Sequence, residues 1–219
     1  MAADAGAWDA PGHCGGDGAV VVLGIGNLLW ADEGFGVRCV ERLQRDWELP
    51  GVVLVDGGTQ GLYLIQHVQA AGRLLIFDAI DYGLAPGTLL ELRDDEVPRY
   101  LGAKKMSLHQ TGFADVLALA RLTGQYPRAV ALVGCQPEEL DDYGGSLRES
   151  VRAALPEAID RGLAILRAWG VAAVPRRQAL DAADTVTLPH LSIERYETGR
   201  PSADAACRVG DARFFPEPR

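Results

Sequence analysis

The sequence predicts an α/β fold, a three-layer sandwich in which a twisted, mostly parallel five-stranded sheet includes one antiparallel strand and carries helices on both faces. Three observations predict this fold class. Short continuous apolar runs such as Val20–Ile25 are typical of strands that are covered on both sides, as in a parallel sheet. Segments with helical spacing alternate with these runs in the order β-α-β-α-β-β-α-β-α. One connection is too short for a helical crossover, which indicates an antiparallel strand.

The first strand–helix unit starts with the strand Val20–Ile25 and continues into a helix from Asp32 to about Trp47. Gly24 and Gly26 close the strand. Asp32 and Glu33 fall in the first turn of the helix, where the helix dipole favours negative charge. This unit therefore places two carboxylates just beyond the end of a buried strand.

The other elements follow from the same patterns of spacing and turn residues. Residues 94–109 are expected to form a long loop with one helical turn, and Pro156 is expected to kink the last helix. The remaining predicted elements are strands at Val52–Val55, Arg73–Phe77, Thr88–Leu92 and Ala129–Val133, and helices at Gly61–Ala70, Gln110–Leu122 and Ser146–Trp169. Thr88–Leu92 is the expected antiparallel strand.

The chain divides into three parts. Residues 1–18 are rich in Ala, Gly and Asp without periodicity, which predicts a flexible N-terminal tail. Residues 19–170 form the α/β domain. Residues 171–219 have weak periodicity and predict an irregular C-terminal extension, with one short helix near Gln178–Ala183.

Composition limits the class of protein and its partners. The net charge of −9 disfavours nucleic acid and anionic membrane surfaces as partners. The first residues have no secretion-signal pattern, and no apolar run approaches the roughly 18 residues of a membrane helix. Four scattered cysteines without a CxxC spacing are typical of free cytosolic thiols. We therefore expect a cytoplasmic protein; the sequence does not indicate its oligomeric state.

Three candidate ligands meet at one edge of the predicted sheet. Ligands of open α/β sheets bind beyond the carboxyl ends of the strands, where the strand order reverses. If the first strand is central, with the second and third on either side of it, Glu33 and Asp78 lie at the gap between the first and third strands. His109 precedes a helix that leads into a parallel strand, so it starts at the same edge.

A Glu, an Asp and a His together can hold a borderline divalent metal such as nickel, zinc or manganese, with positions left for water or substrate. Simpler roles stay open for each residue. Glu33 could complement the helix dipole, Asp78 could cap a turn, and His109 could cap a helix or lie on the surface. Asp32 is interpreted as a helix-start acid without an assigned role.

A nucleotide site is the competing interpretation of the first turn. Gly24 and Gly26 begin a dinucleotide-binding fingerprint, but its third glycine is missing, and Asp32 and Glu33 stand where phosphate would bind. Asp56, at the end of the second strand, keeps this alternative open because a ribose-binding acid is expected there. The chain has neither a GxSxG nor an HExxH motif.

Several segments, taken together, resemble the nickel–iron hydrogenase maturation endopeptidases. They cover about residues 19–170 in the family's order. They read LGIGNLLWADEGFGVRCVE, VDGGTQGLYL, LLIFDAI with APGTLLELRDDEVP, KMSLHQTGFADVLALARLTGQYP, and LVGCQPEEL. The resemblance implies an endopeptidase that removes the C-terminal extension of the hydrogenase large-subunit precursor after nickel insertion.

The same resemblance implies roles for individual residues. Glu33, Asp78 and His109 match the family's nickel-binding triad, and the nickel would be supplied by the substrate rather than held permanently. The loop Asp56-Gly57-Gly58-Thr59 matches a family segment near the cleft and implies contact with the substrate strand, because glycines allow close backbone approach. A non-catalytic nickel- or precursor-binding maturation factor is the alternative within the same pathway. Residues 1–18 and the chain beyond about Val174 have no match in the family pattern.

Overall fold

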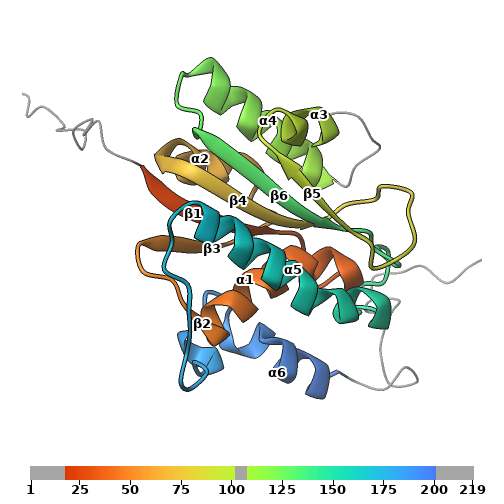
Figure 1. Cartoon of the computed structure of the whole chain (residues 1–219). Coiled ribbons are helices and arrows are strands. Elements are labelled where there is room, and N and C mark those ends of the chain that lie inside the picture. The colour runs from red at the N-terminus through yellow and green to blue at the C-terminus, as the bar shows by residue number, and fades with distance from the viewer. Residues whose placement is uncertain (1–17, 102–107, 201–219) are drawn as a thin grey trace, which may run out of the picture.

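The computed structural model describes residues 18–101 and 108–200 and confirms the predicted three-layer arrangement (Figure 1). The main sheet has the order β3-β1-β4-β6-β5, in which β5 alone is antiparallel to its neighbour. Its strands are β1 (Ala19–Ile25), β3 (Val52–Gly58), β4 (Ala71–Ala79), β5 (Leu89–Arg93) and β6 (Ala129–Cys135). The position of β1 between β3 and β4 agrees with the arrangement on which the placement of Glu33 and Asp78 depended, although the middle strand of the sheet is β4.

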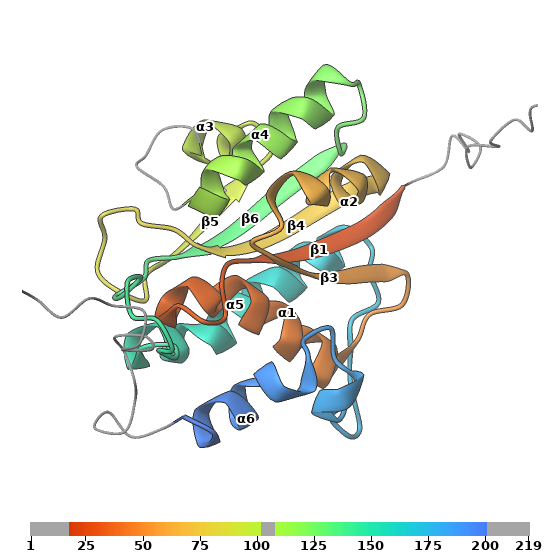
Figure 2. The same ribbon diagram turned by 180° about the vertical axis from the view of Figure 1, so that it is seen from behind.

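The helices cover the two faces of this sheet, as Figures 1 and 2 show. Helices α1 (Phe35–Asp46) and α5 (Glu149–Ala168) lie on one face. Helices α2 (Ile65–Ala70), α3 (Glu96–Leu101) and α4 (Leu108–Leu122) lie on the other. Alternation along β1 explains the division, because Val20 and Val22 pack toward α1 and α5 while Val21 and Leu23 pack toward the opposite helices.

Several element boundaries differ from the sequence prediction. The expected helix from Asp32 begins as the 3₁₀ turn η1 (Ala31–Gly34), and the helix expected from Gly61 begins as η2 (Gly61–Leu64). The α5 helix includes Pro156 and continues for 20 residues. Within the described residues, no helix has both the length and the apolar character that a membrane crossing requires.

The end of α1 shows an effect of distant sequence. Trp47 was expected in the helix, but Trp47–Glu48 forms the short strand β2, which pairs antiparallel with β7 (Val174–Pro175). The Trp47 ring also lies under the Arg167 guanidinium, with 5.3 Å between the guanidinium carbon and the ring centroid. A strand partner more than a hundred residues away leaves no local signal in the sequence.

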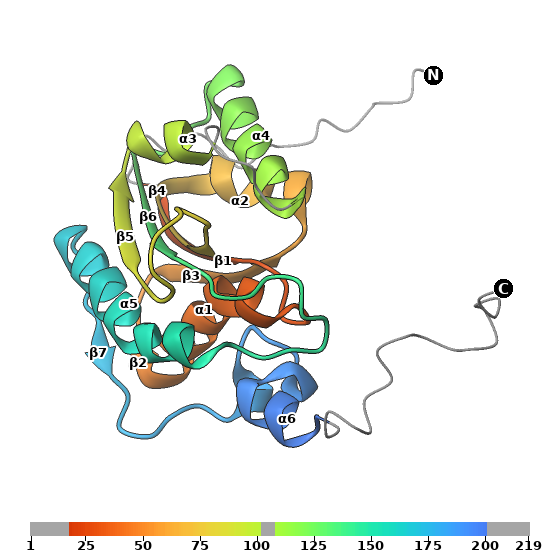
Figure 3. The same ribbon diagram turned by 90° about the vertical axis from the view of Figure 1, so that its right-hand side faces the viewer.

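The described part of the C-terminal extension runs across the outer side of α1, away from the sheet, as Figure 3 shows. The prediction of a helix near Gln178–Ala183 is wrong. The chain instead forms a 3₁₀ turn, η3 (Ala182–Asp184), because the Asp181 side chain accepts a hydrogen bond from the Ala183 N–H at 3.1 Å. Beyond it lie η4 (Pro189–Leu191) and the unpredicted helix α6 (Ile193–Thr198).

Candidate active site

Two of the three candidate ligands lie on segments that contact each other at the carboxyl end of the sheet. Glu33 is in η1, directly after β1, and Asp78 is the next-to-last residue of β4. The η1 turn packs against β4. The predicted position of Glu33 beside the gap between the first and third predicted strands therefore agrees with the observed topology.

Two glycines make this close approach possible. Gly26 has φ +126°, and a Cβ added there would lie 1.7 Å from the Glu33 carbonyl oxygen, so the chain after β1 folds directly back onto its own turn. A Cβ at Gly36 would lie 2.2 Å from the carbonyl oxygen of Phe77, the residue before Asp78. The first turn of α1 thus rests on the backbone of β4.

The backbone just before Glu33 adopts a rare conformation. Ala31 is buried and has φ +37°, in the left-handed region that non-glycine residues seldom occupy. Such conformations persist where the surrounding structure over-determines them, and they are common at functional sites. The orientation of η1 is thus set by its surroundings rather than by local preference.

Glu33 is half-buried, and its surroundings disfavour its negative charge. Burial, and then repulsion from Asp141, raise the pKa of Glu33 to about 7. A carboxylate in this state gains from a nearby cation, which would relieve both effects. Its ordinary helix-dipole role does not account for a shift of this direction, because a helix N-terminus favours the ionised form.

Asp78 is 2% exposed and lies opposite Gly134 of β6. A buried carboxylate at a strand end has the oxygen donors that a divalent metal accepts. The segment that leaves β4 is organised by Gln136, whose side-chain oxygen accepts hydrogen bonds from the Tyr82 and Leu84 N–H groups at 2.7 and 3.1 Å.

His109 lies in the first turn of α4, but its side chain is outside the described part of the structure. The start of α4 lies beside η2, since a Cβ at Gly112 would lie 3.6 Å from the Gly61 Cα atom. Among the side chains that are described, no three His, Cys, Asp or Glu residues form a metal-binding group. The triad of Glu33, Asp78 and His109 accordingly stays a prediction.

The predicted substrate loop Asp56-Gly57-Gly58-Thr59 covers the end of β3 and the turn that follows. The Gly58 carbonyl accepts a hydrogen bond from the Gly26 N–H at 3.0 Å, which ties this loop to the turn after β1. Burial raises the pKa of Asp56, partly opposed by its hydrogen bond with the Gly58 backbone. Asp56 is partly buried, Gly57 is buried and Thr59 is exposed, so the loop becomes accessible at its Thr59 end.

Asp32 has a definite role, which corrects its interpretation as a helix-start acid without one. Its side chain is fully buried. One carboxylate oxygen accepts hydrogen bonds from the Glu138 and Glu139 N–H groups at 2.9 Å each, and the other accepts one from the Arg148 N–H at 2.7 Å. Asp32 therefore fixes residues 138–148, called the site loop below.

The site loop borders the candidate site. Tyr143 lies edge-on to Trp30, three residues before Glu33, with ring centroids 5.5 Å apart. The Gly144 N–H donates to the Leu29 carbonyl at 2.7 Å. Sequence reasoning missed this loop because nothing near Asp32 in the sequence indicates partners more than a hundred residues away.

Comparison with known proteins gives a consistent set of relatives. The family model described as "Hydrogenase maturation protease" matches residues 37–165. The chain is 65% identical over 199 residues to the hydrogenase expression/formation protein HoxM of Cupriavidus necator, covering 90% of this chain and 98% of the relative. It is 44% identical over 164 residues to the hydrogenase 2 maturation protease of Escherichia coli, covering 74% of this chain and 99% of the relative.

The fold has the same relatives. The solved structure of the hydrogenase maturating endopeptidase HybD from Escherichia coli is similar with a TM-score of 0.69 and 44% identity, covering 72% of this chain and 98% of that one. The relatives differ in how much of this chain they match. The HoxM match leaves about a tenth of this chain unmatched, so it must include more than half of residues 171–219, whereas the E. coli relative has no counterpart for about a quarter.

Proposed function

We infer the function from the premise that this chain belongs to the hydrogenase maturation protease family, a family of hydrolases. We propose that it is the endopeptidase that removes the C-terminal extension of a nickel–iron hydrogenase large-subunit precursor after nickel has been inserted. The reaction is expected in the cytoplasm.

The observation that most supports this proposal is the state of Glu33. It lies on a turn packed against the strand that ends with Asp78, and burial together with Asp141 raises its pKa to about 7. This environment penalises an isolated carboxylate and favours one that receives a cation. A metal-loaded substrate would supply such a cation, and an unloaded one would not.

In the proposed mechanism the nickel arrives as part of the substrate. Glu33, Asp78 and His109 would complete its coordination with two oxygen donors and one nitrogen donor, a set that suits nickel. This contact would hold the scissile peptide at the sheet edge, where the loop Asp56–Thr59 would bind the substrate strand. The nickel would polarise the peptide carbonyl or a water molecule.

A thiol nucleophile has little support. Cys135 ends β6 near the same edge, but it is fully buried, and burial together with the nearby charge of Asp32 raises its pKa to about 12. A thiol in this state is almost entirely protonated at neutral pH and is a poor nucleophile. The competing nucleotide-binding function is likewise unsupported, because the fingerprint lacks its third glycine and the Glu33 carboxylate beside this turn would repel phosphate.

The test is incubation of the purified protein with nickel-loaded and nickel-free precursor, read as a mobility shift on a gel. We expect cleavage of the loaded precursor only. Glu33→Ala and His109→Ala should abolish cleavage while the variants stay folded, and His190→Ala, which removes an exposed histidine of η4, serves as the control. Equal cleavage of the nickel-free precursor would reject the mechanism, and binding without cleavage would favour a non-catalytic maturation factor.

A further inference from the structure

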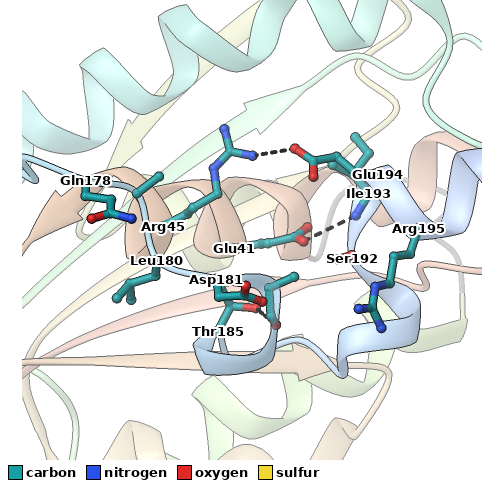
Figure 4. Close-up of a pocket in the computed structure, with 12 residues that line it drawn as sticks. Glu41, Arg45, Gln178, Leu180, Asp181, Thr185, Ser192, Ile193, Glu194 and Arg195 are labelled. Carbon is teal, nitrogen blue, oxygen red and sulfur yellow. Dashed lines mark hydrogen bonds and ion pairs between the residues drawn. The ribbon is translucent and has the colours of Figure 1, made fainter.

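Polar contacts attach the described extension to α1, from Gln44 near the end of the helix to Arg38 near its start. The Arg38 guanidinium is buried and donates to the Glu41 carboxylate at 2.7 Å and to the Leu191 carbonyl at 2.6 Å. Glu41 in turn accepts a hydrogen bond from the Ile193 N–H at 3.3 Å, drawn in Figure 4. A buried ion pair of α1 thus holds the chain just before and at the start of α6.

Between these contacts, α1 and the extension do not pack tightly. A cavity of about 590 Å³ lies between them, and Glu41, Arg45 and Asp181 are among the residues around it (Figure 4). Arg45 reaches Glu194 of α6 at 3.1 Å, but Glu194 remains largely exposed. The position of α6 therefore depends on specific polar contacts rather than on a continuous apolar interface.

The other side of α6 is attached to the site loop. The Ser146 hydroxyl donates to the Glu197 carboxylate at 2.6 Å, and Arg152 forms an ion pair with the same carboxylate. The Tyr196 hydroxyl donates to the Gly145 carbonyl at 3.3 Å. Burial acts to raise the pKa of Glu197, but the hydrogen bonds from Arg152 and Ser146 lower it overall, so the carboxylate stays ionised at neutral pH.

The site loop is therefore held from two sides. Asp32 binds its backbone from the side of the candidate site, and α6 binds Gly145 and Ser146 from the side of the extension. Between these attachments the loop carries Asp141, whose charge acts on Glu33, and Tyr143, which packs against Trp30. A displacement of α6 would therefore be expected to shift Asp141 and Tyr143 relative to the turn that carries Glu33.

We propose that the C-terminal extension is a brace for the active site, and that Glu197 is the positioning residue through which α6 fixes the site loop beside the bound precursor. This proposal rests on the proposed function, because it assigns the loop a role in precursor binding. The E. coli relative lacks a counterpart for about a quarter of this chain, whereas the HoxM match includes much of the extension. The brace is accordingly expected in the longer relatives.

The test compares Glu197→Gln with Glu194→Gln in the full-length chain. Both changes remove one carboxylate from α6. Within the described residues, the Glu194 carboxylate pairs with Arg45 of α1 and forms no hydrogen bond or ion pair with the site loop. Backbone amide exchange of residues 138–148 is measured without precursor, and kcat and KM are measured with nickel-loaded precursor. The melting temperature of each variant monitors folding.

Glu197→Gln should speed exchange in the site loop by on the order of tenfold and raise KM by roughly three- to tenfold, as expected for lost charge-assisted hydrogen bonds at a partly exposed site. The Glu194→Gln protein should match the wild type in both measurements. Ser146→Ala should reproduce the effect, and adding it to Glu197→Gln should change little more, because the two residues share one contact.

Unchanged exchange and unchanged KM in Glu197→Gln would overturn the brace, as would equal effects of both glutamate variants. If the wild-type protein left nickel-loaded precursor uncut, the proposed function would be rejected. Faster amide exchange in the site loop of Glu197→Gln would still support the brace in that case. The two proposals can therefore fail separately.

Discussion

Asp32 offers the sharpest test of how the site is held together. Replacing it with asparagine keeps the shape of the side chain but removes its charge and turns one acceptor into a donor. In the structure one oxygen accepts from two N–H groups and the other from the Arg148 N–H, at 2.9, 2.9 and 2.7 Å. An asparagine can satisfy only one side, and its amide group then faces a backbone donor.

The magnitude follows from these contacts. Hydrogen bonds to a charged acceptor contribute about 1.5–3 kcal/mol each. Three bonds to one buried carboxylate do not add fully, because its desolvation offsets part of the gain. We expect Asp32→Asn to lower the free energy of unfolding by about 2–3 kcal/mol and Asp32→Ala by about 3–5 kcal/mol. For a chain of this size, Asp32→Asn should lower the melting temperature by roughly 4–12 °C.

The assay is urea unfolding followed by circular dichroism, together with amide exchange at Glu138, Glu139 and Arg148. Asp160→Asn, an exposed position on α5, is the matched control and should change stability by less than about 0.5 kcal/mol. If Asp32→Asn were as stable as this control and its three amides stayed protected, the assigned role of Asp32 would be wrong.

Two further predictions concern the charge of Glu33 and the buried pair on α1. Because the pKa of Glu33 rises from 4.5 to about 7 on folding, the folded protein binds more protons than the unfolded chain between these values, and stability is lost as pH rises through this window. Glu33→Gln removes this titration, so in metal-free protein the variant should lose less stability than the wild type between pH 4.5 and pH 8. The difference in the free energy of unfolding should be about 1 kcal/mol, after discounting for solvent screening at a half-exposed group. An identical pH dependence in both proteins would contradict this. Arg38→Ala leaves Glu41 buried without its cation and should cost about 3–5 kcal/mol, whereas the double change Arg38→Met with Glu41→Leu should recover a large part of it. Urea unfolding checks both, and a loss no larger than that of Arg42→Ala, an exposed arginine of the same helix, would refute the role of the pair.

The sequence predicts the sheet and its helices well because their signals are local. The run Val20–Ile25 is apolar on both faces, and both faces are covered in the structure. The short connection before Thr88–Leu92 correctly indicates the antiparallel strand β5. The prediction that α1 extends to Trp47 is wrong for the opposite reason, because the strand partner of Trp47, Val174–Pro175, lies far along the chain.

The candidate site likewise combines features that the sequence predicts with contacts between distant residues that it does not. Topology alone brings Glu33 and Asp78 to one edge, because it depends on the order of strands. The role of Asp32 could not be read from its neighbours, since its three N–H partners are 106, 107 and 116 residues away. Glu33, beside it, has no special sequence signal for a raised pKa, because that shift depends on burial and on Asp141.

The two attachments of the site loop also bear on how the protein forms during synthesis. The unit that contains β1, α1 and β3 can pack early, because its contacts are close in sequence. The Asp32 carboxylate has no hydrogen-bond donors from the site loop until residues 138–148 have been made. Arg38 can bind Leu191 only when 153 further residues have been made. Long-range contacts of this kind form late in folding. Asp32 is thus fixed only after residues 138–148 have been made, so a growing chain on the ribosome would not have a finished active site.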